Sequence, residues 1–256
     1  MSYREDRIAF RFVNLTKEEA DELSKHRADA IVRPQRGDPG KYIMSFPNMN
    51  LNAEDDYSWI EVLIQKYGLS EDKYDFFVSL LTDSDRNVMV VPKFARALFR
   101  RIGGQIEFSY TVGEHGRVPT DKNEVVYREE RIGFRFFNLA KEEADELAQH
   151  MANAIVTPQP KRPGKYMVSP IYMKPGDNYS WIEALIQTYG LSEDKYGFFV
   201  SLITTYPLPI VEVPEFARAL FHRIGGHLHC SVRILDVDSE PENEKEESEI
   251  KDSEAN

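Results

Sequence analysis

Residues 3–23 read YREDRIAFRFVNLTKEEADEL, and residues 127–147 read YREERIGFRFFNLAKEEADEL. The likeness continues along the chain, so that residues 3–106 match residues 127–228 almost without gaps. The period of about 120 residues exceeds the roughly 20–50 residues of solenoid repeats and suits a whole domain. The sequence therefore predicts two similar domains in tandem.

The boundaries of these domains follow from composition. We expect a first domain over residues 1–113 and a second over residues 127–235, each large enough to hold its own core. Residues 114–126 are polar with Gly and Pro, which is typical of a linker. Residues 236–256 form an acidic tail that we expect to be disordered, since almost no apolar residue is available there to offset the entropy of ordering.

Periodicity within each half predicts an α+β fold. Ile8, Phe10 and Phe12 alternate with polar residues as in a strand, and Thr16 with Glu19 matches the capping box of a following helix. In the second half Ala140 replaces that threonine, which removes a hydroxyl cap unless Asn138 supplies one.

The remaining segments extend the same pattern. YSWIEVLIQKYGL and PKFARALFRRI predict two further helices, and FFVSLLT with NVMVV predicts a β-hairpin around residues 83–86. We expect each domain to be an antiparallel or mixed sheet with helices packed on one face. The ferredoxin-like arrangement with extra strands is the nearest common template.

Charge is concentrated at the C-terminal end. Residues 236–256 hold ten acidic residues and two lysines, so the tail carries −8 of the net charge of −11 and leaves −3 for the rest. This tail repels nucleic acid and attracts a basic protein surface, or serves solubility alone. We do not expect nucleic acid as a partner, because the rest of the chain is mildly acidic and the RRM, KH and helix-turn-helix signatures are missing.

The sequence contains no apolar stretch of about 18–20 residues and no signal peptide in its N-terminal residues. We therefore expect a soluble cytoplasmic protein with no membrane partner. The single cysteine, Cys230, excludes an internal disulfide.

No catalytic, cofactor or metal motif emerges. Phosphate-binding glycine loops, H-E-x-x-H and C-x-x-C are absent from the sequence. His222, His227, His229 and Cys230 cluster near the end, but the alternation of a strand points Cys230 away from His227 and His229. We interpret them as two exposed histidines and one core cysteine, and predict no catalytic, cofactor or metal residues.

Two loop pairs distinguish the halves. Residues 46–56 correspond to the shorter 170–178, and the charged 83–91 correspond to 205–213, which carry prolines and apolar residues. An apolar loop tip is a candidate contact surface for a partner or for the other domain, or it packs on its own sheet. The predicted partner-binding residues are Phe46, Asp55, Asp56, Arg86, Tyr172, Tyr206, Leu208 and Ile210.

The element order and two motifs resemble a known group of domains. The motifs are Y-S-W, at 57–59 and 179–181, and L-F-x-R-I-G-G, at 98–104 and 220–226. In this pattern the chain resembles small uncharacterised bacterial α/β domains that include candidate immunity proteins of toxin systems. The tandem arrangement and the acidic tail depart from the single-domain pattern.

These observations favour a non-catalytic protein-binding module, in which the resemblance implies an immunity or inhibitor protein that binds a toxin. An excess of negative charge steers a basic partner. The alternative from another class is an enzyme or small-molecule sensor with a site in the crevice between the domains. A structural or assembly protein, with the repeat serving symmetry alone, is a third reading. The sequence does not fix the oligomeric state.

Overall fold

The computed structural model describes residues 4–46, 51, 54, 56–112, 127–151, 154–206 and 209–235. The predicted linker and the acidic tail lie outside the described residues. The first half contains β1 (Arg4–Leu15), α1 (Lys17–Ser24), β2 (Ile31–Pro34), β3 (Tyr42–Ser45), α2 (Ser58–Tyr67), η1 (Glu71–Lys73), β4 (Tyr74–Thr82), β5 (Arg86–Val90), α3 (Lys93–Ile102) and β6 (Gln105–Val112).

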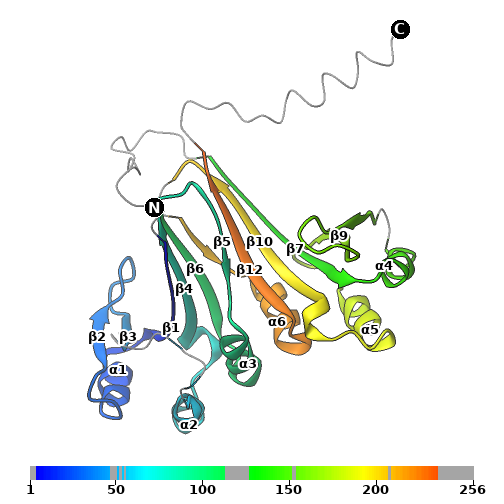
Figure 1. The fold of residues 1–256 in the computed structure, drawn as a ribbon. Helices are drawn as coiled ribbons and strands as arrows, with labels where there is room; N and C mark the ends of the chain where they lie inside the picture. The colour runs from blue at the N-terminus through cyan, green and yellow to red at the C-terminus, as the bar shows by residue number, and fades with distance from the viewer. Residues whose placement is uncertain are drawn as a thin grey trace.

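The second half repeats this order. It contains β7 (Arg128–Leu139), α4 (Lys141–Ala148), β8 (Val156–Pro158), β9 (Tyr166–Tyr172), α5 (Ser180–Thr188), η2 (Glu193–Lys195), β10 (Tyr196–Thr204), β11 (Ile210–Glu212), α6 (Glu215–Ile224) and β12 (His227–Ile234). The α+β class and the mixed sheets with packed helices are thus confirmed. Figure 1 shows α3 and α6 at the centre, with α1 and α2 on one side and α4 and α5 on the other.

The described strands form two six-stranded sheets that exchange one strand. Their orders are β11-β6-β4-β1-β3-β2 and β5-β12-β10-β7-β9-β8. Strand β5 of the first half pairs antiparallel with β12, and β11 of the second half pairs antiparallel with β6. The predicted hairpin of β4 and β5 is therefore wrong. In each sheet the pairs β4–β6 and β10–β12 are parallel, and the ferredoxin-like arrangement is not confirmed.

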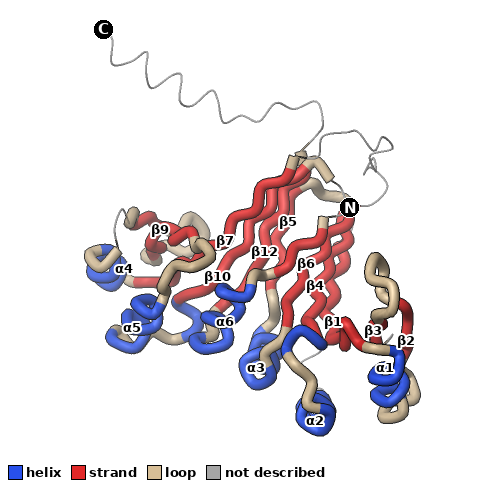
Figure 2. The backbone as a smooth tube through the Cα atoms, turned by 180° about the vertical axis from the view of Figure 1, so that it is seen from behind, coloured by secondary structure: helices blue, strands red, loops and turns tan. Residues whose placement is uncertain are grey.

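The exchange is symmetric. Val91 N donates to Leu228 O at 3.0 Å, and the equivalent Val213 N donates to Ile106 O at 2.9 Å. Figure 2 shows β5 beside β12, and its hydrogen-bonded neighbour in the sheet is β12 rather than a strand of its own half. One of the two loop pairs expected as contact surfaces, 83–91 with 205–213, therefore contains the strands β5 and β11 that pair with the other half of the same chain.

Helices α3 and α6 meet at the centre of the molecule. The rings of Phe99 and Phe221 stack with their centroids 5.3 Å apart. Arg218 Nη1 donates to Gly104 O at 2.8 Å, and its counterpart Arg96 Nη1 donates to Gly226 O. The buried apolar residues of both halves form one continuous cluster. One shared core, rather than two separate cores, therefore holds the described residues together.

The folding of each half follows from its apolar alternation. Phe10, Phe12 and Leu15 face the core with at most 1% of their surface exposed, as do Phe134 and Phe136 in β7. Arg11 and Arg135, each between two of these phenylalanines, face away from the core, since successive strand residues point to opposite faces. Each sheet thus has an inner apolar face and an outer, more polar face, and the outer faces carry the candidate site.

Candidate functional site: an outward pocket on the second sheet

On the outer face of each sheet, residues that lie directly opposite one another on neighbouring strands form a row across the sheet. On the second sheet, Gly133 pairs with Phe199, Phe199 with His229, and His229 with Val90. Val90 comes from the exchanged strand β5. Tyr172 of β9 pairs with Gly133 and extends the row by one strand.

The same row on the first sheet is acidic. Ala9 pairs with Phe77, Phe77 with Glu107, and Glu107 with Glu212 of the exchanged strand β11. The two outer faces therefore differ in chemistry although their backbones are alike.

An ion cluster occupies the outer face of the first sheet. Arg11 donates from Nε to Asp75 Oδ1 at 2.9 Å, from Nη2 to Asp75 Oδ2 at 2.5 Å, and from Nη2 to Glu107 Oε1 at 3.2 Å. Burial raises the pKa of Asp75 to about 6, against the opposing effect of Arg11. Burial alone would lower the pKa of Arg11, but the two carboxylates raise it. The charge of Arg11 is thus balanced inside the protein.

The second sheet keeps the arginine and loses both carboxylates. Arg135 is the counterpart of Arg11, while Gly197 stands at the position of Asp75 and His229 at that of Glu107. Among the described residues, no carboxylate pairs with Arg135. Its guanidinium donates to His229 Nε2 and lies 3.9 Å from Met167 Sδ. Burial lowers the pKa of Arg135, so its charge is only partly compensated.

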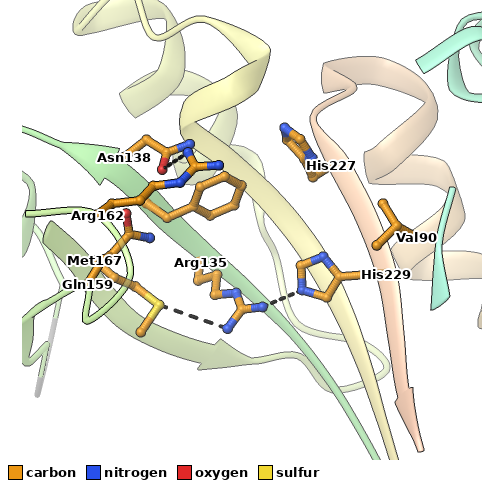
Figure 3. A pocket seen from close by; sticks show the side chains of 9 residues that line it. Val90, Arg135, Asn138, Gln159, Arg162, Met167, His227 and His229 are labelled. Carbon is orange, nitrogen blue, oxygen red and sulfur yellow. Dashed lines mark hydrogen bonds between the residues drawn. The ribbon is translucent and has the colours of Figure 1, made fainter. Parts of the chain in front are cut away.

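A pocket of about 310 Å³ opens beside this arginine. Its lining combines cationic, amide, imidazole and apolar side chains, with no carboxylate among the described residues. The lining residues are Val90, Arg135, Phe137, Asn138, Gln159, Arg162, Met167, His227 and His229. Figure 3 shows Arg135 between Met167 and His229, with His227 and His229 along one strand and Val90 beyond them. The volume fits a small ligand, since ligand pockets begin at roughly 300 Å³.

A second arginine is held over the pocket. Arg162 Nη1 donates to Asn138 Oδ1 at 2.5 Å, and Asn138 Nδ2 donates to Asp194 O at 2.7 Å. At the equivalent place in the first half, Gln35 Nε2 donates to the Asn14 side chain instead. Arg162 replaces an acidic residue, Asp38. The change adds positive charge on the same side as Arg135.

Burial favours the neutral form of both histidines by lowering their pKa values. Burial, helped by Arg135 and His227, lowers the pKa of His229 to about 3. Burial also lowers the pKa of His227, with a further contribution from Arg96. A guanidinium can only donate, so the His229 Nε2 that faces Arg135 carries the lone pair. The expectation of exposed histidines is therefore wrong, because both line the pocket and are partly buried.

Cys230 lies on the opposite face, in the core, as predicted. Burial raises the pKa of its thiol far above the ordinary range. Within the described residues, no group of three His, Cys, Asp or Glu side chains could hold a metal ion.

The predicted partner-binding residues are scattered. Phe46 is buried, with its ring centroid 5.2 Å from that of Trp59. Asp56 accepts hydrogen bonds from Ser58 N and Oγ at 2.8 and 2.9 Å, and so caps α2. Asp55 lies outside the described residues. The 46–56 loop therefore contributes a core contact and a helix cap.

The other predicted residues lie at the strand exchange or on the second sheet. Arg86 begins β5 and pairs with Arg233, and Ile210 begins β11 with about half of its side chain exposed. Tyr206 is partly buried, and its N–H donates to Thr204 Oγ1 at 3.0 Å. Leu208 lies outside the described residues. Tyr172 is also half exposed and shares the outer face with the pocket.

Sequence reasoning missed Arg135 and Arg162. A usable signal was present, because three acidic positions of the first half carry Arg162, Gly197 and His229 in the second. Only the pairing of β7, β10 and β12 brings Gly197 and His229 beside Arg135. Arg162 reaches the same pocket from the loop between β8 and β9, through its hydrogen bond to Asn138.

No protein-family model and no curated protein sequence matches this chain. None of the helices in the described part of the chain has the length and apolar character needed to cross a lipid bilayer.

Proposed function

We propose that the protein is a non-catalytic binding protein that holds an anionic ligand in the outward pocket of its second sheet. One observation carries the proposal: among the residues that the structure describes, Arg135 lacks carboxylate partners such as those that neutralise the equivalent Arg11. A partly buried charge without a counter-ion is costly, and a bound anion removes that cost. A planar guanidinium also matches a carboxylate or phosphate in geometry.

The lining favours binding over chemistry. General acid–base catalysis usually needs a group that titrates near the working pH, or a paired acid and base. The described side chains that line the pocket include no carboxylate, hydroxyl or thiol, and burial lowers the pKa of both histidines below the ordinary value. Arginine and amide groups hold an anion without taking a proton from it. This supports the small-molecule alternative in the form of a binding protein or sensor.

The test is an anion titration of the full-length chain. We expect phosphate, added to protein in a buffer of non-binding ions, to raise the melting temperature, since a ligand that binds only the folded state stabilises it. Arg135→Gln should abolish the rise, and Arg7→Gln, on the first sheet, should leave it intact. An equal response of the wild type and Arg135→Gln to phosphate would contradict the proposal.

A protein partner is the second candidate, and exposed apolar side chains at the sheet edges favour it. Val88 and Val90 on β5 and Ile210 on β11 are 43%, 52% and 52% exposed. Apolar side chains grouped at an edge suit a protein contact. An immunity or inhibitor protein that binds a basic toxin in the cytoplasm is the form that the sequence pattern suggests.

That candidate is tested by photo-crosslinking from position 88 or 210 inside cells. Recovery of one defined protein from both positions, and none from the exposed Val62 on α2, supports it. Crosslinks to many unrelated proteins would argue against it.

A further inference from the structure

A second, smaller pocket lies on the same outer face. It measures about 90 Å³ and is lined by Glu129, Arg131, Tyr172, Phe199, Ser201 and Ile203. Phe199 separates it from the larger pocket, because the Arg135 guanidinium lies 5.0 Å from the centroid of that ring. The ring centroids of Tyr172 and Phe199 are 6.2 Å apart. Aromatic rings and arginines therefore alternate across this face.

The exposed ring belongs to the second half alone. Tyr172 ends β9, which runs Tyr166–Tyr172, whereas the equivalent β3 runs only Tyr42–Ser45. The three additional residues let β9 pair with β7 as far as Gly133. Tyr172 is thereby fixed on the sheet with half of its side chain exposed.

A glycine makes room for the second ring. A Cβ atom on Gly133 would lie 2.3 Å from Phe199 Cζ, so the ring of Phe199 lies directly over the Gly133 backbone. The first half has Ala9 at this position. Phe199 thus lies low on the sheet between Tyr172 and Arg135.

The outer face of the second sheet has Arg135 at one end of the two pockets and Tyr172 at the other, and the charge differs between these ends. Arg131 forms an ion pair with Glu129 and lies with its guanidinium 5.7 Å from the Tyr172 ring centroid. Its charge is already balanced, whereas Arg135 pairs with no carboxylate among the described residues. An anion is therefore attracted to the Arg135 end, and the Tyr172 end offers an aromatic face.

The separation of the two ends limits the ligand. Tyr172 is directly opposite Gly133, and Arg135 is two residues further along β7. With about 3.4 Å per residue and about 4.8 Å between strands, the two Cα atoms are roughly 8 Å apart. A ligand that reaches both ends is a single small molecule, comparable in length with one nucleotide.

We infer that the ligand is a small organic anion with a planar ring, whose anionic group binds at Arg135 while its ring packs on Tyr172. This inference rests on the proposed anion-binding function. Two sources share the chemistry, namely nucleoside monophosphates and aromatic carboxylic acids. Stacking on an exposed aromatic side chain suits either, because every planar ring has a π face.

The experiment compares each ring-bearing anion with its ring-free counterpart on the full-length chain. Adenosine 5′-monophosphate is paired with inorganic phosphate, and phenylacetate with acetate, by ligand-observed NMR titration. We expect the ring to tighten binding by about tenfold or more in at least one pair. The pair that shows the gain identifies the source of the ligand.

Two variants locate the ring. Tyr172→Leu keeps an apolar side chain and should remove the gain while leaving phosphate binding unchanged, whereas Tyr172→Phe should keep the gain. A gain that persists in Tyr172→Leu overturns the inference.

The remaining outcomes separate the inference from the proposed function. Phosphate or acetate binding without a gain from the ring, in both pairs, overturns the inference and leaves the proposed function standing. Binding of none of the four probes overturns both.

Discussion

At the residue scale, single exchanges between the two halves decide the chemistry of the outer faces. Arg11 and Arg135 occupy equivalent positions, yet within the described part of the chain Arg11 has carboxylate partners and Arg135 has none. The two halves can therefore be compared directly. The charge of Arg11 is neutralised within the protein, whereas Arg135 is open to a ligand. The effect of each arginine on stability should therefore differ.

We predict that Arg11→Gln lowers the free energy of unfolding by about 3 kcal/mol, because it leaves Asp75 buried and without its cation. Arg135→Gln should change it by less than about 1 kcal/mol, since no buried carboxylate loses a partner. Urea denaturation of both variants, followed by circular dichroism, measures the difference. Equal losses would show that the two faces are electrostatically alike.

His229 should make the fold acid-sensitive. Its pKa is about 3 in the folded chain, below the 6.5 of an exposed histidine. Neutral His229 therefore contributes stability that is complete above pH 6.5 and is lost as the pH falls towards 3. Between pH 7 and pH 5 the loss should be about 2 kcal/mol.

This loss should be missing from His229→Gln, which cannot take up the proton. Chemical denaturation of the wild type and the variant at both pH values provides the measurement. A variant as acid-sensitive as the wild type would assign the effect to other groups.

At the element scale, the two halves contain the same helices and strands and differ in small details, such as the N-terminal caps of α1 and α4. Thr16 Oγ1 accepts from Glu19 N at 3.1 Å at the start of α1, and Ala140 at the start of α4 has no hydroxyl to do so. Asn138 does not substitute, because its side chain binds Arg162 and Asp194. Glu143 still accepts from Ala140 N at 2.8 Å, so half of the capping box remains.

Ala140→Thr should therefore stabilise the chain by about 0.5–1 kcal/mol through the restored cap. The matched variant Thr16→Ala should destabilise it by a similar amount. Thermal unfolding of both variants tests the pair, and a loss of stability in Ala140→Thr would mean that the threonine side chain cannot reach Glu143 N.

The exchanged strands should be important for stability. Met89 of β5 is 2% exposed and packs in the shared core, whereas its neighbour Val88 points outward. Met89→Ala should cost about 2–4 kcal/mol, as truncation in a core does. Val88→Ala should cost about 0.5 kcal/mol or less. Similar costs in urea denaturation would indicate that β5 is not held on the second sheet.

At the scale of the whole molecule, one core and two exchanged strands join the halves. The sequence predicted two self-contained domains with their own cores, but each sheet contains a strand from the other half. The arrangement resembles a strand-exchanged dimer fused into one chain. It also makes the pocket a product of both halves, since Val90 lines it from β5.

Either half expressed alone should therefore not remain a compact monomer. It would lack the strand that pairs with β6 or β12, and the ring of Phe99 or Phe221 would lose its partner. We expect residues 1–112 or 127–235 alone to dimerise by strand exchange or to aggregate, and the two co-expressed halves to form a one-to-one complex. Light scattering after size exclusion measures the masses. A folded monomeric half would contradict the shared core.

The sequence by itself determined the duplication, the α+β class and most elements, because these depend on local patterns. Alternation in Ile8, Phe10 and Phe12 and the capping box at Thr16 operate over a few residues and are visible without a fold. The core position of Cys230 follows in the same way from alternation along β12.

Only the tertiary structure decided which sheet each strand joins. Backbone hydrogen bonds between strands do not depend on which side chains the strands carry. β6 and β12 have nearly the same alternation of apolar and polar residues, so either could pair with β5. The pattern of β5 is therefore compatible with either partner, and the structure pairs it with β12. The pocket could not be predicted for the same reason. Arg135 and His229 become neighbours only through the pairing of β7, β10 and β12, and Val90 joins them only through the pairing of β5 with β12.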